Sequence, residues 1–220
     1  ATLDTFGDGL WLPAQNSIYV SVMTVVLSVI VSVLAGYGFS RFRFPLKNLL
    51  FVVILSTIMI PFQSILTPIF LVLTKIGLHN TLTGLACVYV TLQLPFSIFM
   101  MRNAFDAVPR EIEEAALVEG CSRWRVFTRI TLPMMRAPLA SAALFVFILN
   151  WSDYLIALLL TTREWVTVPV YMASLSSSMT GQLYGAKAAL GLIAAVPPVI
   201  MGIAIQRHLV RGLTFGGLKQ

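Results

Sequence analysis

Four polar side chains interrupt long apolar stretches of this sequence and could line a solute pathway or form a gate: Gln63, Gln93, Asn150 and Asp153. An unpaired amide or carboxylate in an apolar medium is costly, so such groups normally face protein or a water-filled pathway. Two uses are open for the one carboxylate, Asp153. It could accept a hydrogen bond from a solute hydroxyl, or it could bond to neighbouring backbone and fix a gate. We favour the second use.

Patterns that mark common enzymes are absent from the sequence. It contains no Walker-type glycine loop, no HExxH helix and no GxSxG turn, so nucleotide, zinc-dependent and serine hydrolysis have no motif here. His79 and His208 lie in separate loops, and Cys87 and Cys121 are expected to be unpaired thiols. We therefore expect no catalysis, no bound metal and no cofactor held by this chain.

The composition is that of a membrane protein. Hydrophobic residues make up 58% of the 220 residues and charged residues only 11%, and the mean hydropathy is +0.87. About a quarter of the residues of an ordinary soluble domain are charged. This chain lacks that polar surface, so lipid must surround much of it.

Five apolar runs are each about long enough to cross a bilayer. A helix needs about 20 residues for this, whereas a barrel strand needs only about half as many. The runs therefore predict an all-α polytopic fold with five transmembrane helices: Ile18–Phe39, Leu49–Leu73, Leu82–Met101, Pro138–Leu160 and Ala188–Ile205.

The positive charges predict how the chain lies in the membrane. Twelve of the 15 lysines and arginines follow the first, third and fifth runs, and only Lys75, Arg163 and Lys187 follow the second and fourth. Positive loops are retained in the cytoplasm, so we expect residues 102–137 and the C-terminus there. The net charge of +6 thus reflects topology, and no nucleic-acid partner is expected.

This orientation places Ala1 outside, although the chain has no signal segment. We infer a preceding span, which gives six in all. Residues 1–16 would then be an external loop, 17–210 one transmembrane bundle including the cytoplasmic loop 102–137, and 211–220 a cytoplasmic tail.

Breaks and close packing are both expected within the spans. Prolines should kink several helices around something polar: Pro61 and Pro68, Pro95, and Pro197 with Pro198. Small residues of the first span are expected at close helix contacts: Ser21, Ser28, Ser32, Gly36 and Gly38.

The charged loop between the third and fourth runs predicts two short helices. The first runs from Pro109 to Glu119 and ends at Gly120, with glutamates near its positive end. Its Ile112, Ala115 and Ala116 would share one small, mildly apolar face.

The second helix should run from Ser122 to about Ile130, and Pro133 should end it. Arg125 and Arg129 would lie on one face, with Phe127 opposite. The pair could lie on acidic lipid or dock on a cytoplasmic protein. Glutamates beside the small face favour a protein cleft, because an anionic leaflet repels acidic residues.

The spacing in this loop resembles the EAA loop of ATP-binding-cassette importer permeases. Glu114-Ala115-Ala116 is followed by three residues, Gly120, nine residues, and Ile130-x-Leu132-Pro133. The resemblance implies the type I importer permease fold. It also implies that the loop forms coupling helices held in a cleft of a cytoplasmic ATPase, and this role is expected of Glu114, Ala115, Ala116 and Gly120.

Further segments are similar to the carbohydrate branch of these permeases, and especially to the smaller permease subunit of maltose-type importers. They are Asn16-Ser17, residues 36–42 (GYGFSRF), residues 150–154 (NWSDY) with Pro169, and residues 212–219 (GLTFGGLK). The resemblance implies alternating access for a sugar-like solute. The expected partners are a second permease, two ATPases that hydrolyse ATP, and an external solute-binding protein. In similar permeases the tail reaches between the ATPases, so we expect Phe215, Gly216 and Gly217 to contact them.

Two other functions remain as alternatives. A secondary transporter driven by an ion gradient should show intramembrane acids and internal repeats, and only Asp153 qualifies. A membrane-embedded enzyme would need clustered His, Cys or carboxylates at one depth, whereas His79 and His208 are expected on opposite sides of the membrane.

Overall fold

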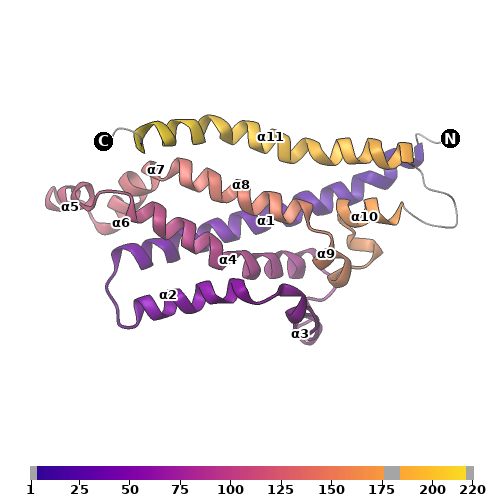
Figure 1. Ribbon diagram of the computed structural model, residues 1–220, viewed down its shortest axis with the longest axis horizontal. Helices are drawn as coiled ribbons and strands as arrows, with labels where there is room; N and C mark the ends of the chain where they lie inside the picture. The colour runs from indigo at the N-terminus through magenta and orange to yellow at the C-terminus, as the bar shows by residue number, and fades with distance from the viewer. Residues whose placement is uncertain (1–3, 176–183, 217–220) are drawn as a thin grey trace.

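The computed structural model describes residues 4–175 and 184–216, and every regular element within these ranges is a helix (Figure 1). The all-α fold class is therefore confirmed. The long helices are α1 (Asp4–Arg41), α4 (Leu82–Asp106), α8 (Arg136–Ser152) and α11 (Tyr184–Gly216). The shorter ones are α2 (Lys47–Ser56), α3 (Phe62–Lys75), α5 (Arg110–Val118), α6 (Arg123–Val126), α7 (Leu132–Met134), α9 (Leu155–Leu160) and α10 (Val168–Ser174).

Three helices are long and apolar enough to cross a membrane, and up to five spans result if each of two bent helix pairs counts as one. The three are Leu10–Arg41, Leu82–Asp106 and Lys187–Ala204. The bent pairs turn by 100° between Met59 and Phe62 and by 72° between Met134 and Arg136. The prediction of five spans holds only when both bent pairs are included.

The first span begins earlier than predicted. Helix α1 starts at Asp4, so the expectation of a loop over residues 1–16 is wrong for its described part. Asn16 and Ser17 could have capped a helix starting near residue 17. Instead the Asn16 amide donates to the Val166 carbonyl (3.0 Å), and the Ser17 hydroxyl accepts from the Val168 N–H (2.8 Å). Neither side chain therefore caps a helix at residue 17. Both bind the segment around residues 166–168, and α1 extends back to Asp4.

Two of the predicted spans are broken. The second run is divided at Pro61, which has an extended backbone between α2 and α3, as expected of a proline kink. In the fourth run, helix α8 ends at Ser152 and α9 is a separate helix beyond Asp153. The prediction of one continuous span over Pro138–Leu160 is therefore wrong. Helices continue through Pro68, Pro95, Pro197 and Pro198.

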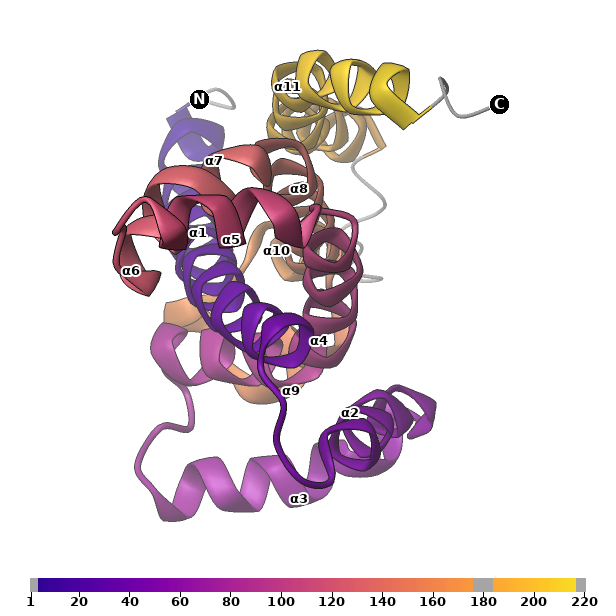
Figure 2. The same cartoon turned by 90° about the vertical axis from the view of Figure 1, so that its left-hand side faces the viewer.

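The centre of the molecule is formed by α1, α4 and α8, which pack against one another (Figure 2). Helix α11 lies on one side of this group, and α2 with α3 lies on the opposite side. The polar residues of α1 face inward, since Ser21, Ser28 and Ser32 are buried. Close packing is confirmed at Gly36, where an added Cβ would lie 2.6 Å from the Met101 Cβ, but not at Gly38, which has open space.

The outer helices expose large apolar side chains. Leu192 and Ile203 of α11 are 75% and 65% exposed, and Leu71 of α3 is 62% exposed. Such exposed apolar surface is unstable in water but suits lipid or another membrane subunit. The exposed surface therefore agrees with the membrane environment that the composition predicts.

Candidate functional sites

Helix α5 projects from one end of the bundle (Figure 1). Pro109 precedes its first residue, Glu111 and Glu113 lie in its first turn, and Gly120 follows its end with φ +86°. Acidic residues in the first turn interact favourably with the helix dipole, and glycine adopts positive φ without strain. The predicted helix over Pro109–Glu119 is thus confirmed to within one residue at each end.

The predicted small face of α5 is divided between the inside and the outside of the protein. Ala116 is buried together with Glu113, whereas Ile112 is 40% exposed and Ala115 is exposed. The prediction of a single outward face holding all three residues is therefore wrong. The physical reason is the contact of Glu113 with α1, which turns the edge formed by residues 113 and 116 inward. The outward face holds Glu114, Ala115 and Val118, the last 89% exposed.

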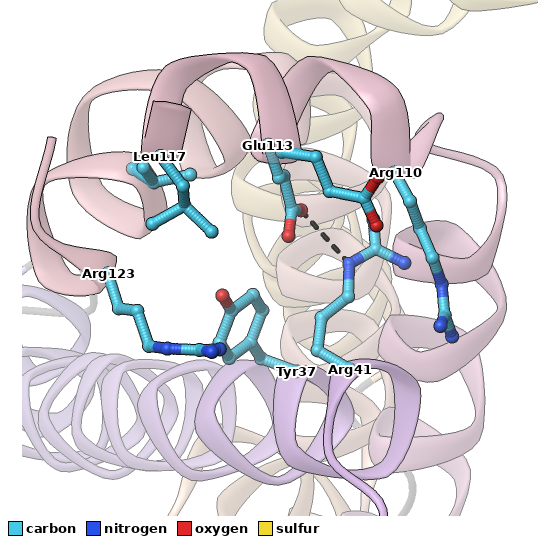
Figure 3. Close-up of a pocket in the computed structure, with 8 residues that line it drawn as sticks. Tyr37, Arg41, Arg110, Glu113, Leu117 and Arg123 are labelled. Carbon is cyan, nitrogen blue, oxygen red and sulfur yellow. Dashed lines mark hydrogen bonds and ion pairs between the residues drawn. The ribbon is translucent and has the colours of Figure 1, made fainter. Parts of the chain in front are cut away.

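A buried ion pair holds α5 against the end of α1 (Figure 3). The Nε of Arg41 lies 3.0 Å from Glu113 Oε1, and the two side chains are 7% and 10% exposed. The same carboxylate oxygen accepts a hydrogen bond from the Thr131 hydroxyl at 3.0 Å. The Arg41 Nη2 donates to the Val108 carbonyl at 2.9 Å. One carboxylate and one guanidinium thus connect four segments of the chain.

A pocket of about 190 Å³ lies beside this ion pair. Figure 3 shows Arg110 on one side of Arg41, and Arg123 next to Tyr37 on the other. The Arg110 Nη2 donates to the Ser40 carbonyl at 3.0 Å, so part of its hydrogen-bonding capacity is used within the chain. The pocket is the gap that remains where α5 and α6 cover the end of α1.

The second loop helix differs from its prediction. Helix α6 ends at Val126, the chain continues as a π-helical segment over Phe127–Thr131, and α7 follows. Pro133 lies inside α7 and does not end the helical path, because an N–H is not needed in the first turn of a helix. The expected faces are confirmed, since Arg125 and Arg129 are exposed and Phe127 is buried.

A second site is a cavity of about 430 Å³ at the break between α2 and α3. Its lining includes Gln63, Gln93 and Asp153, three of the four polar residues that the sequence singled out, and also Tyr89. The fourth, Asn150, accepts a hydrogen bond from the Gln93 amide. The fold thus brings residues up to 90 positions apart in the sequence together in one polar site between apolar helices.

Asp153 is engaged by its neighbours. Its Oδ1 accepts from the Tyr89 hydroxyl at 2.8 Å and from the N–H groups of Ile156 (3.0 Å) and Ala157 (3.4 Å). This carboxylate therefore caps α9 and ties it to α4. The two bonds to backbone N–H groups are those expected if Asp153 bonds to neighbouring backbone and fixes a gate. Tyr89 was not singled out by the sequence, because a tyrosine in an apolar run carries no distinctive signal.

Other predicted features are described only in part. Residues Arg211–Gly216 continue α11 as a helix, so the tail does not begin at residue 211. Gly216 is the last residue of this helix, whereas the side chain of Phe215 and the whole of Gly217 lie outside the described part of the chain. In the described ranges, Cys87 and Cys121 are free thiols, and no group of three His, Cys, Asp or Glu side chains could hold a metal ion.

Comparison with protein families gives one match that covers most of the chain. The family described as "Binding-protein-dependent transport system inner membrane component" matches residues 20–215. The chain is 35% identical over 210 residues to the lactose transport system permease protein of Rhizobium radiobacter, covering 93% of this chain and 74% of that one. It is 34% identical over 208 residues to the maltodextrin transport system permease protein of Bacillus subtilis, with 93% and 74% covered.

Solved structures share the fold at lower identity. A bacterial transporter that imports the acidic polysaccharide alginate superposes with a TM-score of 0.69 at 23% identity, over 98% of this chain and 79% of that one. The methionine transporter MetNI in an inward-facing conformation gives 0.70 at 16% identity, over 96% and 97%. At these identities the likeness concerns the fold alone.

Proposed function

Because this chain belongs to the family of binding-protein-dependent transport system inner membrane components, we propose that it forms one half of the membrane pathway of an ATP-driven sugar importer. The observation that carries this proposal is α5, which projects from the bundle and exposes Glu114, Ala115 and Val118. A surface helix with acidic and small apolar residues on its outer face fits a cleft in another protein.

The partner of α5 is a cytoplasmic ATPase subunit. Glu114 and Ala115 lie on the outward face of α5, and Gly120 ends the helix with its exposed turn. Ala116 is buried within the chain, so its part in coupling is to let α5 pack closely against the bundle. ATP is hydrolysed by the two ATPase subunits, and this chain holds no nucleotide.

The polar cavity is part of the solute pathway. It opens where α2 and α3 meet at an angle of 100° and where α8 ends. Two amides and a tyrosine hydroxyl line it, and Asp153 is the only charged residue among the described lining residues. Amides and hydroxyls match the neutral hydroxyl groups of a sugar. Relatives named for lactose, trehalose and maltodextrin transport support the same solute class.

The complete importer contains further subunits. A second permease supplies the other half of the pathway, as a heterodimer partner against the exposed apolar faces of the bundle. An external solute-binding protein delivers the sugar, in a bacterial or archaeal plasma membrane with the C-terminus of this chain in the cytoplasm. The alternating access of the pathway follows the ATP-driven approach of the two ATPases.

An ion-gradient-driven transporter is the alternative, and its one candidate acid is Asp153. That carboxylate already accepts three hydrogen bonds on one oxygen. Two of these bonds come from the first turn of α9 and one from Tyr89 of α4, as expected of a carboxylate that fixes local structure. The geometry therefore favours a gate or helix-cap role for Asp153 over a proton-carrying role.

The test is reconstitution of this chain with its neighbouring permease, ATPase and binding protein in proteoliposomes. The binding protein is first screened against sugars by thermal shift, and the best sugar is used as a labelled solute. Uptake that requires both ATP inside and the loaded binding protein outside supports the proposal. Uptake by this chain alone under an ion gradient would reject it.

A further inference from the structure

The three glutamates near the start of α5 lie in different environments. Glu111 and Glu114 are exposed, whereas Glu113 is buried against Arg41 of α1. A partner protein cannot reach a buried carboxylate, so Glu113 is not part of the outward docking face. Removal of one member of a buried ion pair leaves the other charge uncompensated and is strongly destabilising, so a change at Glu113 should loosen α5 from the bundle.

The attachment has three members. Glu113 Oε1 accepts from Arg41 Nε on α1 and from the Thr131 hydroxyl, both at 3.0 Å. Thr131 is fully buried and is the last residue of the π-helical segment. A single oxygen therefore joins α1, α5 and the π-helical segment. Short π-helical segments within helices are frequently found at functional sites.

The arginine is itself held by additional bonds. Its Nη2 donates to the Val108 carbonyl at 2.9 Å and its Nη1 to the Ser40 hydroxyl at 3.1 Å. The Ser40 hydroxyl in turn donates to Asp106 at the end of α4. The guanidinium is thus oriented from several sides, so its contact with Glu113 has one defined geometry.

Without this attachment α5 could hinge about its first residue, where the Arg110 Nη2 donates to the Ser40 carbonyl of α1. It has nine residues, and short non-helical connections join it to α4 and to α6. Of the helices described, α5 packs mainly against α6, which is itself only four residues long. A force applied to the outer face of α5 would then tilt α5 and α6, and little of it would reach the membrane helices.

We propose that Arg41, Glu113 and Thr131 form a coupling clamp that stays closed throughout the transport cycle, so that α5 and the cytoplasmic end of α1 move as one body. This inference rests on the proposed function, since it assigns the path by which movement of the ATPase reaches the pathway. The three residues are positioning residues, because they touch neither the solute nor the ATPase.

The first experiment compares Glu113→Gln with Glu119→Gln, a change at the exposed C-cap residue of α5, in the reconstituted importer. Both changes remove one charge from α5, but only the first affects the clamp. ATPase co-purification, ATP hydrolysis stimulated by the loaded binding protein, and solute imported per ATP hydrolysed are measured together. Glu113→Gln should keep the ATPase bound while import per ATP falls at least about fivefold, the lower end of typical coupling between sites. Glu119→Gln should leave all three quantities unchanged.

The second experiment replaces the ion pair by a covalent link. Arg41→Cys and Glu113→Cys are combined in a background in which Cys87 and Cys121 are serine, and a short bismaleimide joins the two new thiols. The unlinked pair should import little sugar per ATP, and the linker should restore most of the ratio. This comparison decides the question even if Glu113→Gln lowers the yield of protein.

Two results would overturn the clamp. One is an unchanged import ratio in Glu113→Gln with a fully assembled complex. The other is a linker that blocks import, which would mean that α1 and α5 must separate during the cycle. Failure of the unmodified complex to import sugar would instead reject the proposed function itself, and so the two failures are distinguishable.

Discussion

Replacement of Gly36 by alanine should destabilise the contact between α1 and α4. The added Cβ would lie 2.6 Å from the Met101 Cβ, 2.9 Å from the Arg102 backbone nitrogen and 3.0 Å from the Met101 carbonyl carbon. Ordinary contact begins at 3.4 Å, so α4 must recede by about 0.8 Å. The near atoms belong to the α4 backbone and to a Cβ fixed to it, so no side-chain rotation relieves the overlap.

The expected magnitude follows from this displacement. A gap of about 0.5–1 Å loses a quarter to a half of the dispersion energy of the atoms that it separates. Overpacking of a tight contact typically costs about 1–3 kcal/mol. Alanine also gains about 0.5–1 kcal/mol over glycine within a helix, which offsets part of this cost. The net effect should still lower the free energy of unfolding.

Gly38→Ala provides the matched control. Gly38 lies two residues away in the same helix, and a Cβ there would meet nothing within 4 Å. The control should therefore keep the helix gain alone and be neutral or slightly more stable. Both variants are purified in the same detergent, and the temperature at which half of each protein loses its monodisperse elution peak is compared. Equal midpoints for the two variants would refute the close-contact argument.

Three further predictions concern the functional sites. Ala115→Arg should leave the chain folded but prevent co-purification of the ATPase, because Ala115 is exposed on the outer face of α5. Ala116→Arg should in addition lower the yield of folded protein, because Ala116 is only 7% exposed. Asp153→Asn should change the import rate only mildly without shifting the apparent affinity for sugar, since the residue caps α9; a large change in affinity would show direct solute contact. Deletion of residues 212–220 should preserve membrane insertion but alter ATP hydrolysis by the assembled complex, and identical rates at matched protein levels would contradict a role for the tail.

The sequence predicts those features that depend on local chemistry. The limits of α5 follow from Pro109 and Gly120, whose backbone preferences act on their immediate neighbours. The break at Pro61 is likewise local, since proline removes a donor and restricts the residue before it. Apolar length alone predicts α4 as a span, and the structure has it at Leu82–Asp106.

Features that depend on distant partners could not be read from the sequence. The inward face of α5 is selected by Arg41, which is 72 positions from Glu113. Helical spacing groups Ala116 with Ile112 and Ala115, but it does not show which edge of that group turns towards the bundle. The partner of Asn16 could not be read from the sequence either, because the Val166 carbonyl lies 150 positions away. In both cases the polar residue was visible and its partner was not.

The two candidate sites lie on helices that pack tightly against each other. Arg41 ends α1, and the close contact at Gly36 lies about one and a half turns before it, against Met101 of α4. Tyr89 and Gln93 of the polar cavity lie on the same α4, two to three turns further towards its N-terminus. A shift of α5 that moves the end of α1 must therefore also move α4, because their backbones have no room to slide past each other at Gly36. Tyr89 would carry this shift to Asp153 through its hydroxyl hydrogen bond, and thereby to the start of α9.

The expected consequence is that Gly36→Ala, besides its loss of stability, reduces the amount of sugar imported per ATP hydrolysed in the fraction that assembles, whereas Gly38→Ala does not.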